Sequence, residues 1–185
     1  MDTPNFSKIE NSIFSEVVKL EDGTEVLIRP IKATDAPKLQ ASFERLSPRS
    51  IRLRFLSDKK ELTEKEARRF ATVDYKTNMA FVAETVDPSS KNIVGVSRYA
   101  SNPNHPTEAE AAIIVTDAYQ GRGLGKQLMM RLVDYAKKYG IRYFRATVLL
   151  GNDRILNFIQ KSGLSFEKKF EYGAWEIKVD IGNNN

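Results

Sequence analysis

Cysteine is absent from this sequence of 185 residues, and histidine occurs once, at His105. The lack of cysteine excludes disulfide bonds, thiolate metal sites and a cysteine nucleophile. One histidine argues against a histidine-rich zinc site and a Ser-His-Asp triad, so we expect no metal. No apolar run approaches the ~18 residues that a membrane-spanning helix needs. Any chemistry must therefore rest on carboxylates, tyrosines, backbone dipoles or a bound cofactor.

The N-terminal segment MDTPNFSKIE has neither a basic region nor an apolar stretch. We therefore expect no secretory leader, no membrane partner and a cytoplasmic protein. The content of 41% hydrophobic and 29% charged residues is typical of a globular chain. The length favours one domain. We expect it over residues 13–182, after a flexible arm at 1–12 and before a frayed tail at 183–185.

Positive charge is concentrated in one stretch of a chain whose net charge is +5. Between residues 118 and 145, seven arginines and lysines accompany a single acid, Asp134. Such an excess can attract nucleic acid or a phosphorylated cofactor, and a solvated basic helix face is the alternative. No helix-turn-helix, zinc or RNP-type motif accompanies the charge, so we expect no nucleic-acid partner.

Hydrophobic periodicity predicts an α/β fold with a mixed sheet. A β-α-β crossover over 108–150 requires parallel neighbours, whereas the hairpins around it require antiparallel ones. We therefore expect a mostly antiparallel central sheet flanked by helices, and we place His105 in a proline-rich loop at 102–106. The expected strands are 14–20, 24–31, 79–86, 92–100, 108–115, 141–150 and a closing hairpin over 164–181; the expected helices begin near 34, 47, 63, 124 and 152.

The most informative segment is a glycine-rich turn between a strand and a helix, with the sequence Gln120-Gly121-Arg122-Gly123-Leu124-Gly125-Lys126. Three glycines let the backbone approach a ligand and direct N–H groups toward it, and the following helix N-terminus favours phosphate. A dinucleotide fingerprint would need glycine in place of Lys126. A Walker loop would need glycine in place of Gln120 and Ser or Thr in place of Gln127. A glycine-rich helix start without a ligand is the alternative.

The segment VTDAYQGRGLG at 115–125 resembles the acyl-CoA pyrophosphate loop of the GNAT acetyltransferase superfamily. The motif Gln/Arg-x-x-Gly-x-Gly/Ala is matched by Gln120, Gly123 and Gly125. Residues 152–163 resemble the downstream helix of that family. Residues 28–55 and 109–115 look most like the Pat-type protein lysine acetyltransferases, which usually carry a second domain that we do not recognise in this sequence.

The resemblance implies direct transfer of acetyl from acetyl-CoA to a primary amine, with a protein lysine favoured as the acceptor. A small-molecule amine acetyltransferase and a non-catalytic acyl-CoA-binding module are the alternatives. Neither the acceptor nor the oligomeric state follows from the sequence. The residues that the resemblance assigns to acetyl-CoA are Ile113, Ile114, Val115, Gln120, Gly121, Arg122, Gly123, Leu124, Gly125, Lys126 and Asn152.

Glu110 is the candidate general base, in a position where Pat-like sequences have a glutamate usually given this role. Strand alternation places Glu110 with Ala112 and Ile114 on one face, among small or apolar neighbours. Glu108 lies on the same face and is the less favoured alternate. A solvent-facing strand glutamate without catalytic function is the other interpretation. No general acid is predicted, because Ile159 stands where many GNAT enzymes have a tyrosine.

Overall fold

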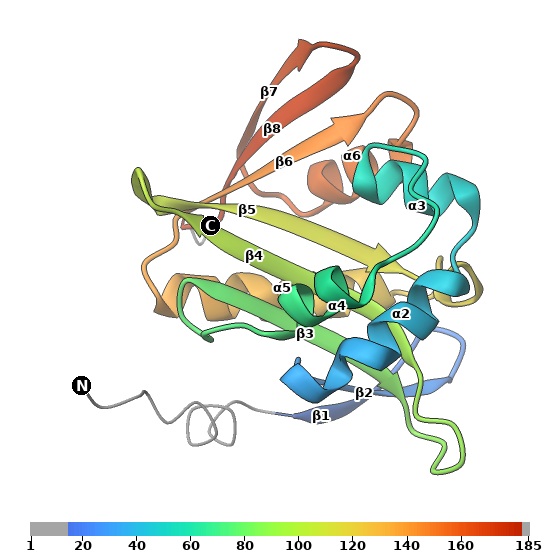
Figure 1. The fold of residues 1–185 in the computed structure, drawn as a ribbon. Coiled ribbons are helices and arrows are strands. Elements are labelled where there is room, and N and C mark those ends of the chain that lie inside the picture. The colour runs from blue at the N-terminus through green and yellow to red at the C-terminus, as the bar shows by residue number, and fades with distance from the viewer. Residues whose placement is uncertain (1–14, 183–185) are drawn as a thin grey trace.

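The computed structural model describes residues 15–182, so the predicted arm at 1–12 and tail at 183–185 lie outside the described residues. One sheet of eight strands runs in the order β1-β2-β3-β4-β5-β6-β8-β7 (Figure 1). The strands are β1 (Glu16–Lys19), β2 (Glu25–Pro30), β3 (Asn78–Thr85), β4 (Ile93–Asn102), β5 (His105–Val115), β6 (Tyr143–Leu149), β7 (Phe166–Glu171) and β8 (Ala174–Asp180).

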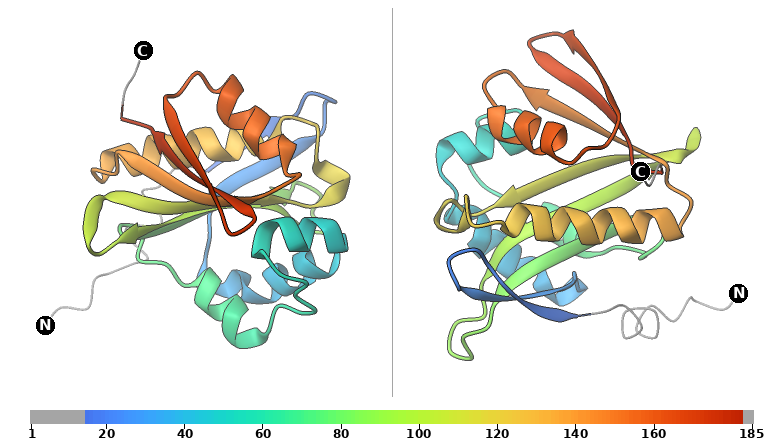
Figure 2. Two further views of the ribbon diagram at one scale, coloured as in Figure 1. Left: turned by 90° about the horizontal axis from the view of Figure 1, so that it is seen from above. Right: turned by 180° about the vertical axis from the view of Figure 1, so that it is seen from behind.

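Helices cover both faces of this sheet, with α2, α3 and α4 on one face and α5 and α6 on the other (Figure 2). The α-helices are α2 (Ala36–Glu44), α3 (Pro48–Phe55), α4 (Glu64–Ala71), α5 (Leu124–Lys138) and α6 (Asp153–Lys161). Two short 3-10 turns, η1 (Ala33–Asp35) and η2 (Asp117–Tyr119), accompany them. None of the helices in the described part of the chain is long and apolar enough to cross a membrane.

The predicted mixed sheet is confirmed, because β5 and β6 pair in parallel while the other neighbouring strands pair antiparallel. Local signals explain several boundaries. Thr63 and Glu66 form a reciprocal capping box at the start of α4. Gly140, with φ +78°, follows the end of α5, where a left-handed residue closes the helix without strain.

The prediction of a loop at 102–106 is wrong. The strand β4 extends to Asn102 and β5 begins at His105, which pairs with Asn102, so only two residues form the turn. The Asn102 side chain accepts a hydrogen bond from the N–H of Asn104 at 3.0 Å and closes this turn. Proline is tolerated here because Pro106 lies at the exposed end of its strand.

A buried ion network joins β2, η1, α2 and β3. Arg29 donates to both carboxylate oxygens of Asp35, at 2.7 and 2.8 Å, and to Glu84 at 3.1 Å. Lys38 also donates to Glu84. Burial acts to raise the pKa of both carboxyls, but hydrogen bonds outweigh it and hold both pKa values below their ordinary range. Asp35 accepts them from Arg29 and the Lys32 backbone N–H, and Glu84 accepts them from Lys38 and Arg29. The network therefore stays charged and links the first helices to the sheet.

Replacing Arg29 by leucine would leave two buried carboxylates without their shared cation. Removing one partner of a buried ion pair typically costs ~3–5 kcal/mol. We expect Arg29→Leu to lower the free energy of unfolding by about this amount, measured by urea denaturation at pH 7. Arg68→Ala is the control, because Arg68 and Glu64 pair on the surface with side chains 71% and 67% exposed. Such pairs contribute less than ~0.5 kcal/mol, so equal losses in the two variants would contradict the role of Arg29.

Candidate active site

The sheet opens between β5 and β6. Their parallel register covers only Glu108 to Glu110, opposite Tyr143 to Arg145. Beyond Glu110, β5 continues to Val115 with β4 on one side, and no strand of the described chain pairs with its other edge. The two strands diverge toward the end of the sheet near α3 and α6 (Figure 1). This divergence leaves backbone N–H and C=O groups of β5 available to a ligand.

The glycine-rich turn lies at the end of this opening, between β5 and α5. Gly121 and Gly123 have φ values of +73° and +83°, which glycine adopts without steric cost. Within residues 15–182, the N–H groups from Gly121 to Lys126 donate no hydrogen bond. A Cβ added at Gly121 would meet nothing within 4 Å, so the space above the turn is open. Unpaired N–H groups at a helix N-terminus fit a phosphate group, as the sequence predicted.

The turn between β1 and β2 packs against the glycine-rich turn. A Cβ on Gly123 would lie 2.8 Å from Oε1 of Glu21, whose exposed side chain can move aside, so glycine is needed here for its positive φ rather than for space. Arg122 pairs with Asp22 at 2.7 Å, and its guanidinium stacks on the Tyr119 ring at 5.3 Å. Because the charge of Arg122 is already paired, the cation of this turn that faces solvent is the exposed Lys126.

The Gln120 side chain connects three elements around the glycine-rich turn. Its Nε2 donates to the carbonyl of Val115 at 2.9 Å and to Oγ of Ser50 at 3.1 Å. Its Oε1 accepts a hydrogen bond from Arg154 in α6. The Gln120 side chain thus links the end of β5 to α3 and α6 through hydrogen bonds within the protein. Asn152, the N-cap of α6, lies after β6 on the other side of the opening.

Glu110 is the last residue of β5 that pairs with β6, and its side chain is exposed. The predicted alternation of β5 is confirmed. Ile114 lines a pocket together with α2 and α3 side chains, whereas Ile113 and Val115 pack in the core cluster that contains the inner face of α5. Glu110 therefore projects from the sheet face covered by α2, α3 and α4.

Glu108 has different surroundings. It is 8% exposed and accepts hydrogen bonds from Lys178 at 2.6 Å and Arg145 at 3.1 Å. The bond from Lys178 and the charges of Arg145 and Lys178 outweigh burial and lower the pKa of Glu108. A carboxylate held in two ion pairs is a poor proton acceptor, so the geometry favours Glu110 over Glu108 as a base.

The basic stretch at 118–145 is largely neutralised by acids from other parts of the chain. Each of its four arginines has a carboxylate within ion-pair distance. The pairs are Arg122 with Asp22, Arg131 with Glu16, Arg142 with Asp180 and Arg145 with Glu108. Sequence reasoning missed this because every one of these acids is more than thirty positions away. The stretch therefore carries less net positive charge in the folded protein than the sequence alone suggests.

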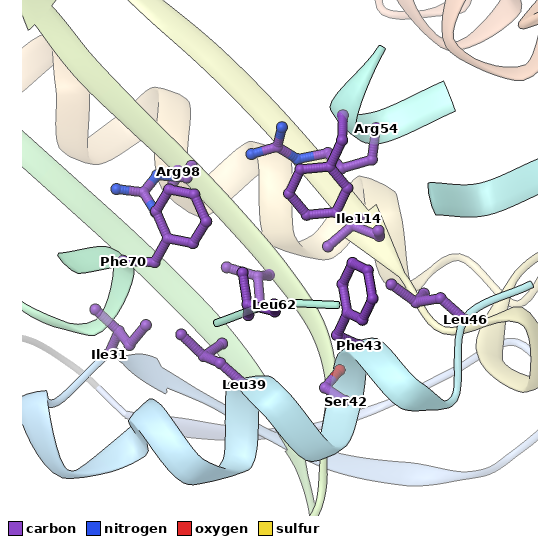
Figure 3. A pocket seen from close by; sticks show the side chains of 12 residues that line it. Ile31, Leu39, Ser42, Phe43, Leu46, Arg54, Leu62, Phe70, Arg98 and Ile114 are labelled. Carbon is purple, nitrogen blue, oxygen red and sulfur yellow. The ribbon is translucent and has the colours of Figure 1, made fainter. Parts of the chain in front are cut away.

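Sequence reasoning also missed a pocket on the sheet face from which Glu110 projects. Its volume is about 50 Å³, its walls are mostly apolar, and two arginines, Arg54 and Arg98, contribute to it (Figure 3). These arginines come from α3 and β4, so no spacing in the sequence relates them to each other. No group of three or more His, Asp or Glu residues that could hold a metal ion occurs in the described part of the chain.

Comparisons with known proteins agree with this geometry. Acetyltransferase PA5475 of Pseudomonas aeruginosa is 36% identical over 137 residues, which are 74% of this chain and 72% of that protein. Acetyltransferase Pat of Mycolicibacterium smegmatis is 26% identical over 164 residues, 89% of this chain, which spans only 48% of that protein.

Solved structures share the fold. The GNAT domain of S. lividans PAT has a TM-score of 0.79 and 28% identity, covering 97% of this chain and 99% of that domain. The structure of yncA from Salmonella typhimurium with acetyl-CoA has a TM-score of 0.62 at 17% identity, over 82% of this chain and 89% of that one. The profile of the Acetyltransferase (GNAT) family matches residues 48–164. This chain belongs to the GNAT family of acetyltransferases, which confirms the fold and the acyltransferase class predicted from its sequence.

Proposed function

We propose that this acetyltransferase transfers the acetyl group of acetyl-CoA directly to the side-chain amine of a lysine in another protein. The observation that carries the proposal is the position of Glu110, an exposed carboxylate at the point where β5 and β6 part. The same opening leads along β5 to the glycine-rich turn. The proposed base therefore lies on β5, and the proposed phosphate site lies in the turn that follows this strand.

Acetyl-CoA, when bound, supplies a thioester that a neutral amine can attack. The N–H groups from Gly121 to Gly125 would bind its pyrophosphate, aided by the positive end of α5. The unpaired edge of β5 from Ile113 to Val115 would hydrogen-bond its pantetheine arm. Five residues of strand separate Glu110 from Val115, which corresponds to about 16 Å. The site therefore suits an extended ligand with its reactive end near Glu110.

Glu110 acts as the general base in this mechanism. A lysine amine has an ordinary pKa of ~10.4 and is almost wholly protonated at neutral pH, so it must lose a proton before it attacks. The Glu110 carboxylate accepts that proton directly or through one water. With no cysteine in the chain, the amine attacks without an acetylated enzyme intermediate. A leaving thiolate with a pKa near ~8.5 can take its proton from water.

A protein acceptor is supported by the resemblance of residues 28–55 and 109–115 to Pat-type enzymes and by the match to the GNAT domain of S. lividans PAT. The exposure of Glu110 also suits a lysine, because its long side chain can reach the carboxylate while the partner's backbone stays outside. A cytoplasmic location stays a prediction.

Acetylation of a panel of acceptors tests the acceptor class. The protein is incubated with acetyl-CoA and lysine peptides, a polyamine or an aminoglycoside, and the released thiol is followed. We expect turnover with peptides and intersecting initial-rate lines when both substrates are varied. Turnover with the small amines alone would contradict a lysine acceptor, parallel lines would contradict direct transfer, and acetyl-CoA binding without any turnover would indicate a non-catalytic module.

Gly123→Asp should abolish acetyl-CoA binding, measured by calorimetry. The variant adds a negative charge next to the N–H groups that are expected to bind the pyrophosphate. Gly140→Asp is the control at the other end of α5. Gly140 also has a positive φ, +78°, so both variants add one negative charge at a positive φ, although only the Cβ at position 123 has a close neighbour, Glu21. Undiminished affinity in a folded Gly123→Asp protein would overturn the assignment of the turn.

Glu110→Gln should lower kcat by about 10²–10⁴-fold near neutral pH, because the amide keeps the shape and loses the basicity. The deficit should shrink as the pH rises toward the pKa of the amine, where solvent deprotonates the acceptor. Acetyl-CoA affinity should remain. Glu167→Gln, which changes an exposed glutamate on β7, is the control and should have normal turnover. Near wild-type turnover of Glu110→Gln at pH 7 would assign the base elsewhere.

A further inference from the structure

The pocket lined by Arg54 and Arg98 lies between the sheet and the layer formed by α2, α3 and α4 (Figure 3). Arg98 of β4 pairs with Ala112 of β5, and Ala100 pairs with Glu110, so Arg98 and Glu110 belong to the same face of the sheet. Phe43 and Leu39 of α2 form the opposite wall. The pocket is large enough for one small apolar group and lies on the face from which Glu110 projects.

Two guanidinium groups lie at one end of this pocket. Arg98 stacks over the ring of Phe70 at 4.7 Å, and Arg54 lies 5.1 Å from the ring of Phe55. Both arginines are partly buried. In the described part of the chain, neither forms a hydrogen bond or an ion pair with a carboxylate. Among residues 15–182, Glu110 is the acid whose charge acts on both of them.

The charge at this end of the pocket is uncompensated. Burial, followed by the charges of Arg54 and Arg69, lowers the pKa of Arg98 to about 10, and Glu110 opposes this shift. Burial likewise lowers the pKa of Arg54 against the effect of Glu110. The charges of Arg54 and Arg98 are thus opposed by that of Glu110. An anion placed between the guanidiniums would relieve both the repulsion and the desolvation.

Buried Arg29 shows what a structural arginine looks like in this chain. It is 8% exposed and makes hydrogen bonds to two carboxylates. Arg54 and Arg98 have no such partners, although removing a guanidinium from water is costly unless an anion accompanies it. The phosphates of acetyl-CoA are expected at the start of α5, on the opposite face of the sheet. The acceptor is the other reactant of the proposed reaction, and it can bring an anion to the face that carries Arg54 and Arg98.

We propose that Arg54 and Arg98 bind the carboxylate of an aspartate or glutamate that lies close to the acceptor lysine in the partner protein. This inference rests on the proposed acetylation of protein lysines. A Lys⁺ beside an acidic residue is complementary to Glu110 beside the two arginines, and such complementarity selects partners and their orientation. An apolar side chain next to that acid fills the pocket. The acetyltransferase thus selects lysines in acidic, partly apolar sequences.

Paired peptides test this selectivity. Each peptide has one lysine and a single glutamate, which is moved through the three positions on either side, and each has a glutamine counterpart. The kcat/KM of every pair is measured at saturating acetyl-CoA. We expect the glutamate peptide to be preferred by about 10–100-fold at one or two positions, since a charge-assisted hydrogen bond contributes ~1.5–3 kcal/mol.

Variants then assign the preference to the two arginines. In Arg98→Gln and Arg54→Gln, kcat/KM for the glutamate peptide should fall. Its ratio to kcat/KM for the glutamine counterpart should then be close to one. Arg98→Glu should turn the preference toward arginine at the same position, a reversal that general destabilisation cannot produce. Arg52→Gln, which changes an exposed arginine on α3, is the control and should keep the preference.

The outcomes separate the two proposals. Equal rates with glutamate and glutamine peptides at all positions overturn the acidic preference and leave lysine acetylation intact. A preference that survives in Arg54→Gln and Arg98→Gln overturns the assignment to these residues. No acetylation of any peptide overturns the lysine acceptor and this inference together. Calorimetry with acetyl-CoA checks that each variant remains folded and binds the co-substrate.

Discussion

The early parting of β5 and β6 is the constraint on which the rest of the site depends. Two parallel strands linked by one crossover helix would ordinarily pair along their length, and here they share three registered residues. The unpaired edge of β5 joins a carboxylate at one end to a cluster of free N–H groups at the other. The carboxylate lies on β5 and the N–H groups lie in the turn that follows β5, so the strand sets most of the distance between them.

In the described part of the chain, buried and half-buried charged side chains form ion pairs or hydrogen bonds, with one exception. Arg29 has its carboxylates, Glu108 has two cations, and the arginines between residues 122 and 145 have acids from other segments. The exception is the pair of arginines beside Glu110. Their lack of partners is informative because the surrounding structure pairs charges so consistently. It locates the place where a charged group of another molecule completes the arrangement.

Local patterns predicted most of the fold. Patterns that act over a few residues can be read directly from the sequence. Examples are the capping box at Thr63, the glycines of the glycine-rich turn and the alternation along β5. The strand face of Glu110 follows from the same alternation. The prediction failed at His105, where prolines concealed the end of a hairpin that pairing with β4 extends.

The electrostatics of the site could not be predicted, because they depend on residues brought together by folding. The sequence suggested a basic segment, yet Arg122 and Arg145 meet Asp22 and Glu108. Gln120 matches a ligand-binding motif, and its side chain instead joins three elements of the protein. Arg54 and Arg98 come from a helix and a strand that are unrelated in the sequence.

The short register between β5 and β6 also has a mechanical consequence. The part of the sheet formed by β6, β8 and β7 pairs with the other strands through that one short ladder, and the hydrogen bond from Arg154 to Gln120 also ties α6 to the turn after β5. A small rotation about this ladder would displace the far end of β6 and the start of α6 much more than Glu110, which lies at the pivot. The opening could therefore widen for exchange of a long ligand while the position of the carboxylate is preserved.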